Sequence, residues 1–239
     1  MYSNKENINI LTSLLLEWGV TDAVVCPGSR NAAIVHNLNE CGTIRCHPIT
    51  DERSAAFYAM GIALNTKRPT VVCVTSGSAL LNTAPAVAEA YYQHVPLIVV
   101  AADRPQQWID QLDGQTLPQP DALNRFVRRS VSLPEPRTEE ERWYCNRLVN
   151  EALHAATFRQ LAPVLINVPI TEPLFTFDVA ELPKERRFRM LDSEAALTNT
   201  TVEVLQQELY QAKRPLIVVG QMAADSFGCS VFDINELSK

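Results

Sequence analysis

The sequence contains no C-x-x-C pair, no G-x-G-x-x-G run and no Walker-type phosphate loop. The first absence argues against a thiol-based metal or redox site, and the other two argue against a nucleotide-binding loop of the usual kind. Basic residues are outnumbered, with 21 lysines and arginines against 27 aspartates and glutamates, which gives a net charge of −6. Because nucleic-acid-binding domains normally carry a basic patch, we expect no nucleic-acid partner.

Long apolar runs are also missing. None approaches the roughly 18 residues that a membrane-spanning helix needs. The apolar stretch near the N-terminus has no basic segment before it and no small-residue cleavage site after it. The cysteines follow no regular spacing, and several lie in apolar runs, where a thiol behaves as a small hydrophobic group. We therefore predict a cytoplasmic protein without membrane insertion, whose thiols are buried and reduced. The cysteines are Cys26, Cys41, Cys46, Cys73, Cys145 and Cys229.

What the chain does contain is an alternation of helical and strand patterns. Its 239 residues, 46% of them hydrophobic, suffice for one complete domain and part of another. Short, β-branched, continuously apolar runs alternate with stretches of helical spacing, which is typical of an α/β fold with a parallel sheet covered by helices on both faces. The expected helices cover residues 6–18, 31–40, 51–65, 79–93 and 138–158, and the expected strands cover 22–26, 43–49, 70–75, 96–102 and 163–169.

The pattern changes after residue 170. Residues 171–198 mix prolines, aromatic residues and charges, and we predict an irregular linker on the domain surface, anchored by Leu174, Phe175 and Phe177. A helix over 201–212 and a buried strand within "RPLIVVGQM" follow, and the sequence ends soon after. We expect 1–170 to form the α/β domain. Because a lone strand leaves its backbone hydrogen-bonding groups unpaired, the strand after the helix needs further neighbours, and we expect 199–239 to begin a second, truncated α/β domain.

Four successive strands of the expected sheet each end in a polar cluster. The clusters are "CPGSR" at 26–30, "TDER" at 50–53, "TSGS" at 75–78 and "ADRP" at 102–105. The carboxyl ends of parallel strands lie on one edge of a sheet, and open α/β sheets bind their ligands there. We therefore predict that the polar side chains of these clusters converge on one cleft. They are Ser29, Arg30, Glu52, Ser76 and Arg104.

Two glutamines extend this prediction. The connection after the fourth strand is long, and long connections in compact domains are usually functional or disordered. We expect Gln115 and Gln119, in "DGQTLPQP", to reach into the same cleft.

Each cluster also has an explanation without a ligand. Glu52 lies in the first turn of an expected helix, where the helix dipole favours a carboxylate by roughly 0.3 to 1 kcal/mol. Arg30 and Arg104 are open to explanation as surface ion-pair partners, which contribute about 0 to 1 kcal/mol. Ser78 is best explained as a helix N-cap.

Taken together, "CPGSR", "TDERSAAFYAMGIA", "TSGSALLNTAPAVAEA" and "ADRP", in this order and spacing, resemble the N-terminal, pyrimidine-binding domain of thiamine diphosphate enzymes. The serine-arginine after proline-glycine and the "DRP" most resemble the carboligases of menaquinone (vitamin K2) biosynthesis, which decarboxylate 2-oxoglutarate and add the succinyl unit to isochorismate. The resemblance covers about residues 7–220. It implies a transferase as the full-length protein, and inactivity of this chain alone.

The resemblance also implies roles for individual residues. Glu52 is the catalytic residue that hydrogen-bonds the pyrimidine ring and promotes loss of the thiazolium proton, while the protein supplies orientation and a proton path. Arg30 and Arg104 bind substrate carboxylates, which a guanidinium group contacts in a planar, bidentate way. Ser29 and Gln115 add polar contacts to the substrate, although "LDGQ" replaces the family's "CGANQ"-like run. The remaining cofactor-binding residues are Pro27, Gly28, Thr75, Ser76 and Gly77.

The family's diphosphate- and metal-binding segment, a glycine-aspartate-glycine run ending in paired asparagines, does not occur in these 239 residues. We therefore expect no metal ligand here, and Mg²⁺ or Mn²⁺ to be held by a further C-terminal domain of a second subunit, in a homodimer or tetramer. Two alternatives stay open. One is another thiamine diphosphate-dependent decarboxylase or carboligase, such as an acetolactate synthase-like enzyme, and the other is a non-catalytic α/β module that binds a dicarboxylate.

Overall fold

The computed structural model describes residues 1–191 and 196–216. The chain divides into two compact units, Met1–Arg189 and Met190–Lys239, which we describe separately. The strand predicted within residues 214–222 lies almost entirely outside the described residues, and so does Cys229.

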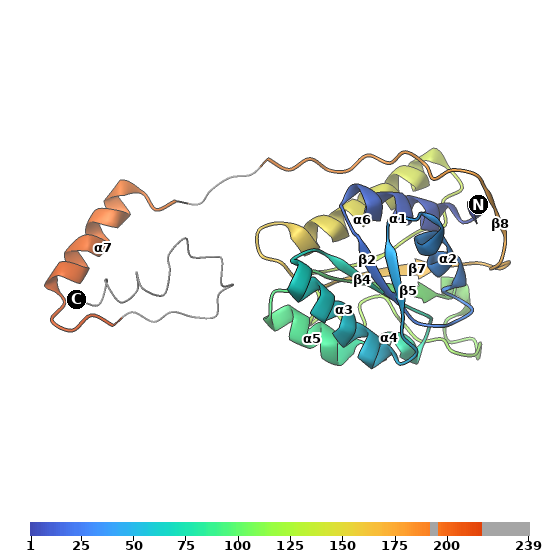
Figure 1. The fold of residues 1–239 in the computed structure, drawn as a ribbon, viewed down its shortest axis with the longest axis horizontal. Helices are drawn as coiled ribbons and strands as arrows, with labels where there is room; N and C mark the ends of the chain where they lie inside the picture. The colour runs from blue at the N-terminus through green and yellow to red at the C-terminus, as the bar shows by residue number, and fades with distance from the viewer. Residues whose placement is uncertain (192–195, 217–239) are drawn as a thin grey trace. The chain divides into compact units, whose positions relative to one another are not determined.

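The first unit is built on a six-stranded sheet in the order β3-β2-β4-β5-β7-β6, with parallel pairing throughout (Figure 1). The strands are β2 (Asp22–Val25), β3 (Arg45–Pro48), β4 (Thr70–Val74), β5 (Leu97–Asp103), β6 (Arg129–Ser132) and β7 (Val164–Pro169). The helices are α1 (Glu6–Glu17), α2 (Ala32–Glu40), α3 (Glu52–Thr66), α4 (Ser78–Asn82), α5 (Ala84–Tyr92) and α6 (Glu139–Thr157), and a 3-10 turn covers Gln106–Trp108. The predicted α/β fold with a parallel sheet is thus confirmed.

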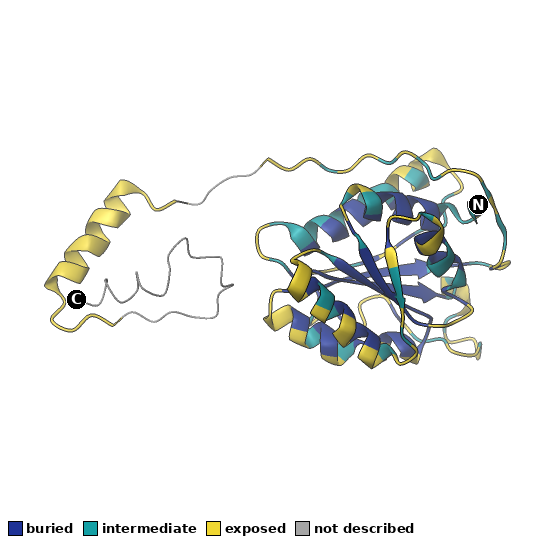
Figure 2. Ribbon diagram, viewed as in Figure 1, coloured by how far each residue is buried: buried dark blue, intermediate teal, exposed yellow. Residues whose placement is uncertain are grey.

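Helices cover both faces of this sheet, so its central strands are buried on both sides (Figure 2). In β4, Val71 and Cys73 contribute to the core that includes residues of α1, α2 and α6, whereas Val72 and Val74 contribute to the core that includes residues of α3, α4 and α5. The α3 alanines expected to allow close packing are indeed buried, at 0% or 1% exposure. They are Ala55, Ala56, Ala59 and Ala63.

Two features of the first unit differ from the sequence prediction. The single helix expected over 79–93 is divided into α4 and α5 at Thr83. Pro85 lies in the first turn of α5, and because proline has no N–H it cannot continue the hydrogen-bond ladder of a preceding helix. The edge strand β6 was not predicted, since Arg129–Ser132 is polar and partly exposed and carries no apolar run.

The segment after β7 runs along the surface of the first unit, as predicted. Residues 172–185 contain no helix, and a short strand, β8 (Phe177–Val179), pairs antiparallel with β1 (Tyr2–Ser3). Ser13 Oγ donates a hydrogen bond to Pro183 O at 2.7 Å, which fixes the segment against α1.

Two of the three expected anchors of this segment are correct. Leu174 is buried, and Phe177 packs against the core with its ring stacked on His36 at a centroid distance of 3.9 Å. Phe175 is 64% exposed, so its assignment as an anchor was wrong.

The second unit contains α7 (Asn199–Gln211), which matches the helix expected over 201–212. The Thr198 side chain accepts a hydrogen bond from the Thr201 N–H and caps the helix. None of its side chains is buried. Within the described part of the chain, no helix is both long and apolar enough to cross a membrane.

The strand order brings particular turns together. From β2 the chain moves to β3 on one side and then to β4 on the other side of β2. The turns that follow β2 and β4 are therefore neighbours on the carboxyl edge, and such a reversal is where open α/β sheets bind ligands. The turn after β5 lies next along the same edge.

Candidate active site

A cavity of about 490 Å³ opens where the segments after β2, β3, β4 and β5 meet. Every residue predicted for the site lines it, with the exceptions of Gly77 and Gln119. Glu172 and Leu174, which the sequence reasoning missed, complete the wall. The lining residues are Pro27, Gly28, Ser29, Arg30, Glu52, Thr75, Ser76, Arg104, Gln115, Glu172 and Leu174.

The proline-glycine turn after β2 allows two chain segments to approach closely. A Cβ placed on Gly28 would overlap Thr75 Cβ, so no other residue type fits at this position without a shift of the neighbouring turn. The turn is fixed by Asn31, whose Nδ2 donates to Cys26 O at 2.8 Å. Burial, reinforced by the nearby Glu52 carboxylate, raises the pKa of the Cys26 thiol to about 12. Cys26 is therefore a neutral thiol at physiological pH and not a nucleophile.

Glu52 is the first residue of α3. It lines the cavity and is half-buried. The capping role in this turn belongs to Asp51, whose Oδ1 accepts the Ser54 N–H at 2.8 Å. Glu52 Oε2 instead accepts a hydrogen bond from Asn82 Nδ2 of α4 at 3.3 Å. The carboxylate is thus oriented across the cavity edge while its position in the first turn still suits the helix dipole.

Arg30 is held rigidly at the other side of the cavity. Its side chain is 6% exposed, Nη1 donates to Ile170 O at 2.9 Å, and Nη2 lies 3.3 Å from Glu172 Oε1. Nε is buried and has no hydrogen-bond partner among the described residues. Because a buried donor without a partner costs roughly 1 to 3 kcal/mol, this guanidinium is poised to bind a further acceptor.

Arg104 lies beside Arg30 and approaches the cavity from the end of β5. Its Nε is 2.8 Å from Asp113 Oδ2, and Nη2 donates to Gly114 O at 3.0 Å. Both arginines therefore have acidic partners, as the ion-pair explanation requires. With side-chain exposures of 6% and 19%, however, neither guanidinium group lies on the surface, although their partners Glu172 and Asp113 are 75% and 37% exposed.

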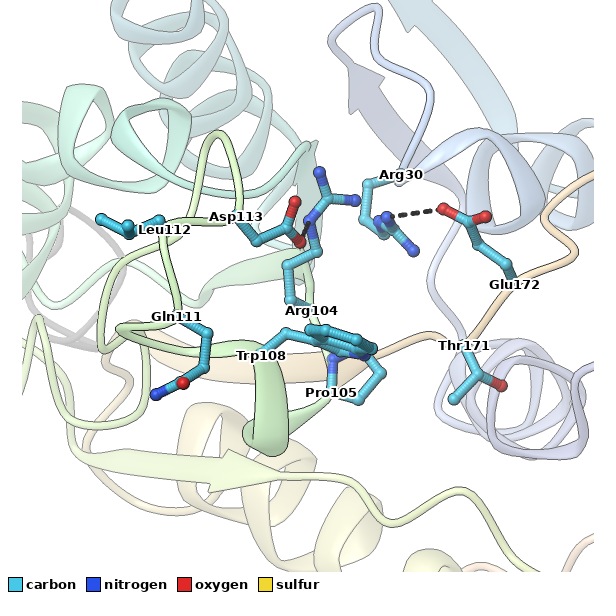
Figure 3. A pocket seen from close by; sticks show the side chains of 9 residues that line it. All are labelled: Arg30, Arg104, Pro105, Trp108, Gln111, Leu112, Asp113, Thr171 and Glu172. Carbon is cyan, nitrogen blue, oxygen red and sulfur yellow. Dashed lines mark hydrogen bonds and ion pairs between the residues drawn. The ribbon is translucent and has the colours of Figure 1, made fainter.

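The two arginines also line a second cavity, of about 470 Å³, on the side of the loop after β5 (Figure 3). Trp108, Leu112 and Asp113 contribute to its wall. A ligand that reaches from one cavity to the other would therefore pass both guanidinium groups.

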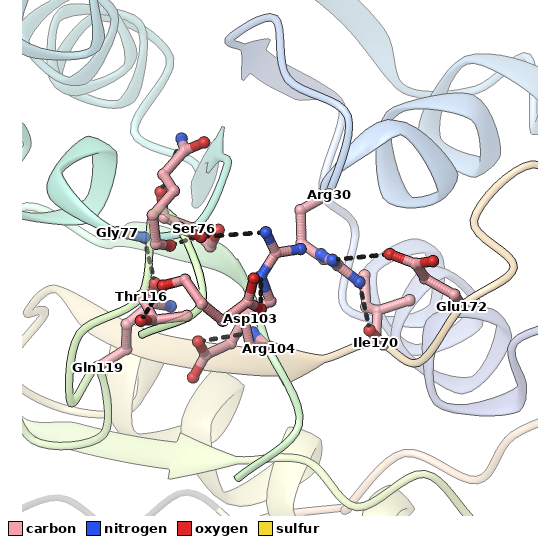
Figure 4. A network of polar contacts seen from close by, with 12 residues as sticks. Arg30, Ser76, Gly77, Asp103, Arg104, Thr116, Gln119, Ile170 and Glu172 are labelled. Atoms are coloured by element: carbon pink, nitrogen blue, oxygen red, sulfur yellow. Dashed lines mark hydrogen bonds and ion pairs between the residues drawn. The ribbon is translucent and has the colours of Figure 1, made fainter. Parts of the chain in front are cut away.

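The loop after β5 is joined to the "TSGS" turn (Figure 4). Ser76 Oγ donates to Gln115 O at 3.1 Å, and Gln115 Nε2 donates to Ser76 O at 3.2 Å. Gln115 therefore lies at the cavity, where the resemblance to the family expected it. Gln119 does not, because it is fully buried and outside the cavity wall.

The "TSGS" turn also corrects one assignment. Ser78 is the first residue of α4 and not its cap, a position that Gly77 occupies with φ of 80°. The Gly77 N–H is already bound by Gln119 Oε1 at 2.6 Å. Of the missed residues, Glu172 could have been predicted from the sequence, because it follows the carboxyl end of β7 as the other site residues follow β2, β3, β4 and β5.

No group of three or more histidine, cysteine, aspartate or glutamate side chains in the described part of the chain is placed to hold a metal ion. The cavity offers instead the two guanidinium groups of Arg30 and Arg104, the two carboxylates of Glu52 and Glu172, and several polar uncharged side chains. This donor set suits an organic ligand with anionic groups.

Comparison with known proteins agrees with this geometry. Residues 8–124 match the family model described as thiamine pyrophosphate enzyme, N-terminal TPP binding domain. The 2-succinyl-5-enolpyruvyl-6-hydroxy-3-cyclohexene-1-carboxylate synthase of Bacteroides thetaiotaomicron is 52% identical over 225 residues, which is 93% of this chain and 40% of that protein. The synthase of the same name from Phocaeicola vulgatus is 50% identical over 222 residues, with the same two shares. That of Porphyromonas gingivalis is 39% identical over 220 residues, 92% of this chain and 38% of the relative.

The chain therefore spans about 40% of the length of the first two of these curated relatives. The matched domain contains the turns that line the cavity after β2, β4 and β5. We conclude that residues 8–124 are similar to the N-terminal TPP binding domain of thiamine pyrophosphate enzymes, and that the chain is similar to part of the 2-succinyl-5-enolpyruvyl-6-hydroxy-3-cyclohexene-1-carboxylate synthases.

Proposed function

We propose that this chain is the pyrimidine-binding part of a thiamine diphosphate-dependent carboligase of menaquinone biosynthesis. The whole protein would decarboxylate 2-oxoglutarate and add the succinyl unit to isochorismate. The observation that carries the proposal is the convergence of Glu52, Arg30 and Arg104 on one cavity. A carboxylate for the cofactor ring and two cations for substrate carboxylates are what this chemistry requires.

The cavity fits the pyrimidine end of the cofactor. Its wall near Gly28 and Thr75 is made by two turns at close approach, and this wall would lie against the pyrimidine ring. Thiamine diphosphate, when bound, supplies the acidic carbon and the electron sink on which a 2-oxo acid loses carbon dioxide. Glu52 would accept a hydrogen bond from a ring nitrogen and hold a proton there. Pro27, Gly28, Thr75 and Ser76 would border the ring, and Gly77 would shape the turn behind them.

Arg30 and Arg104 would hold the carboxylates of the substrates. Both proposed substrates are dicarboxylates, and guanidinium groups bind carboxylates through paired hydrogen bonds. Arg30 contributes a buried donor that has no partner among the described residues. Ser29 and Gln115 would add polar contacts at the same wall.

A second subunit of the same protein would complete the site. Large apolar side chains are exposed on the helices that lie on the Glu52 side of the sheet, which is the kind of surface that a partner covers. They are Phe57, Tyr58 and Leu64 of α3, Leu81 of α4, and Tyr91 and Tyr92 of α5. The diphosphate and its Mg²⁺ or Mn²⁺ would be held by a further domain of that subunit.

The test is an assay of the full-length protein with thiamine diphosphate, Mg²⁺, 2-oxoglutarate and isochorismate. We expect carbon dioxide release and formation of the succinylated product, both dependent on the cofactor. Carboligation with pyruvate in place of 2-oxoglutarate would instead identify an acetolactate synthase-like enzyme. Tight binding of dicarboxylates without any cofactor-dependent turnover would overturn the proposal in favour of a binding module.

A further inference from the structure

Three buried polar side chains form a row beside the cavity, between the turn after β4 and the end of β5; Figure 4 labels two of them, Gln119 and Asp103. Gln119, Asn167 and Asp103 are 0%, 0% and 2% exposed. Gln119 Oε1 accepts the Gly77 N–H at 2.6 Å, and Gln119 Nε2 donates to Asn167 Oδ1 at 2.8 Å. Asn167 Nδ2 donates to Asp103 Oδ2 at 2.8 Å, and Asp103 Oδ1 accepts the Arg104 N–H at 2.7 Å. The row thus joins Gly77 to Arg104 without interruption.

The direction of every hydrogen bond in the row is fixed by its neighbours. The Gly77 N–H can only donate, so it determines which end of the Gln119 amide faces it. The Ala102 carbonyl can only accept, which fixes the amide nitrogen of Gln119 toward it. That nitrogen can only donate, so it faces the Asn167 amide oxygen and leaves the Asn167 nitrogen for Asp103. Both amides therefore point their donors toward Asp103, and hydrogen bonds aligned in this way strengthen one another.

The two ends of the row adjoin the cavity wall. Gly77 follows Thr75 and Ser76 directly, and Arg104 follows Asp103. Burial raises the pKa of Asp103, while the hydrogen bonds from Asn167 and the Arg104 N–H counteract it. A buried carboxyl group whose hydrogen bonds are satisfied holds its partners in one arrangement. Here those partners are the Arg104 N–H and, through Asn167 and Gln119, the Gly77 N–H, which both adjoin the cavity wall.

We propose that Gln119 is a positioning residue, which fixes the "TSGS" turn and Arg104 relative to each other through Asn167 and Asp103. The turn belongs to the wall that would border the cofactor, and Arg104 belongs to the wall that would bind the substrate. Gln119 touches neither ligand. For the identity of these ligands the inference rests on the proposed function, whereas the hydrogen bonds themselves do not.

The first test probes the hydrogen-bond network directly and requires no enzymatic assay. In the intact protein, amide hydrogen exchange is followed by mass spectrometry in peptides that cover Thr75, Ser76 and Gly77. Gln119→Met keeps the size of the side chain but removes its acceptor, so exchange of these peptides should accelerate at least about tenfold, because a buried amide without a partner is easily opened. Peptides from β5 should keep their protection. Unchanged exchange at Gly77 would overturn the inference.

The second test separates positioning from folding. Gln119→Glu keeps the acceptor for Gly77 but, when ionised, has no donor for Asn167 or Ala102 and adds a charge to a site that already holds Asp103. Since burial raises the pKa of a carboxyl group, lowering the pH should protonate the introduced side chain and restore one O–H donor. The kcat/KM of Gln119→Glu relative to wild type should therefore rise as pH falls, while the ratio for Gln119→Met stays flat.

Both variants should lose about a hundredfold in kcat/KM at neutral pH, the loss expected from a misplacement of about 1 Å. Gln206→Glu makes the same chemical change at an exposed position of α7 and should match wild type. If wild type is active and both Gln119 variants keep its kcat/KM at every pH, the inference fails and the proposed function stands. If wild type has no cofactor-dependent activity, the proposed function fails. Hydrogen exchange at Gly77 would still show whether Gln119 holds the turn in place.

Discussion

Arg30 Nη2 lies 3.3 Å from Glu172 Oε1, but the two side chains differ greatly in exposure, since that of Arg30 is 6% exposed and that of Glu172 is 75% exposed. Arg30 is also fixed by its hydrogen bond to Ile170 O, whereas Glu172 projects from the segment after β7 (Figure 3). The Glu172 carboxylate thus occupies the place on Arg30 that an anionic ligand would take. A ligand carboxylate can displace it at low cost, because exposed ion pairs contribute only about 0 to 1 kcal/mol.

Replacing Glu172 by glutamine should therefore strengthen the binding of anionic substrates. In the full-length enzyme we expect KM for the substrate that contacts Arg30 to fall, by up to about fivefold if the displaced pair is worth about 1 kcal/mol. Steady-state kinetics with each substrate varied in turn would measure this. Glu181→Gln removes the same charge from an exposed position on the same segment and serves as the control. A rise in KM would show that Glu172 helps to bind the substrate.

Alanine in place of Arg30 or Arg104 should impair the use of the carboxylate substrates. Each loss should amount to about 2 to 5 kcal/mol in kcat/KM, the range for removing one partner of a buried charge pair. Arg30→Lys should recover only part of it, because an ammonium group cannot make paired, planar contacts. Kinetics identical to wild type for both alanine variants would contradict the assignment of these side chains to substrate binding.

Glu52 and Asp51 are adjacent in sequence, but substitutions at the two positions should affect different properties, the proton exchange of the cofactor and the stability of the fold. Glu52→Gln keeps the shape of the side chain and removes the anionic acceptor, so exchange of the cofactor's acidic hydrogen for deuterium should slow by about a hundredfold to ten-thousandfold. The melting temperature should change little. NMR of the bound cofactor after rapid acid quenching would follow the exchange step by itself.

The matched variant is Asp51→Ala, which removes the N-cap of α3. It should lower the melting temperature and leave the exchange rate near that of wild type. If Glu52→Gln instead behaved like Asp51→Ala, Glu52 would be a helix-end carboxylate without a role in the chemistry.

Stability should depend on pH through Asp22 at the first residue of β2. Burial alone would raise the pKa of this carboxyl group, but hydrogen bonds from His47 at 2.9 Å and Thr21 at 2.9 Å, together with Arg45, lower it overall. Because the folded-state pKa lies below the unfolded value, the ionised group stabilises the fold above about pH 4, and this contribution disappears as pH falls through the folded-state pKa.

Asp22→Asn should accordingly be less stable than wild type at pH 7, by about 1 kcal/mol, the net contribution of a typical hydrogen bond. The difference should shrink as the pH is lowered below about 4, where the unfolded-state carboxyl group also begins to protonate. Urea denaturation of both proteins at several pH values would measure it. A difference that grew toward low pH would contradict the assignment.

The parts of the fold that could be predicted from the sequence are those decided by local pattern. Continuous β-branched runs identified β4, β5 and β7, and the alanine spacing of α3 identified the side that packs on the sheet. The edge strand β6 has no apolar run, and its strand conformation results from pairing with β7, which no local pattern reveals.

In the candidate site, too, the residues placed by local sequence pattern were predictable and those placed by tertiary contacts were not. The turns after β2, β4 and β5 were predictable because parallel strands end on one edge. Glu172 was missed because its neighbours in sequence, Thr171 and Pro173, resemble a linker. Gln119 was placed in the cleft because a polar side chain in a long loop is expected there, whereas its fully buried network with Asn167 and Asp103 depends on the tertiary structure.

The pairing of β1 with β8 ties the first residues of the unit to the segment that carries Glu172. Tyr2 and Ser3 pair with Val179 and Phe177, and the Asn4 N–H donates to Thr176 O at 3.1 Å. β1 thus holds the segment that forms one wall of the cavity, although β1 itself lies outside the parallel sheet. Proteolytic trimming at Tyr2, or a fusion tag packed against it, would loosen the Arg30 side of the cavity while the sheet and its two cores stayed intact.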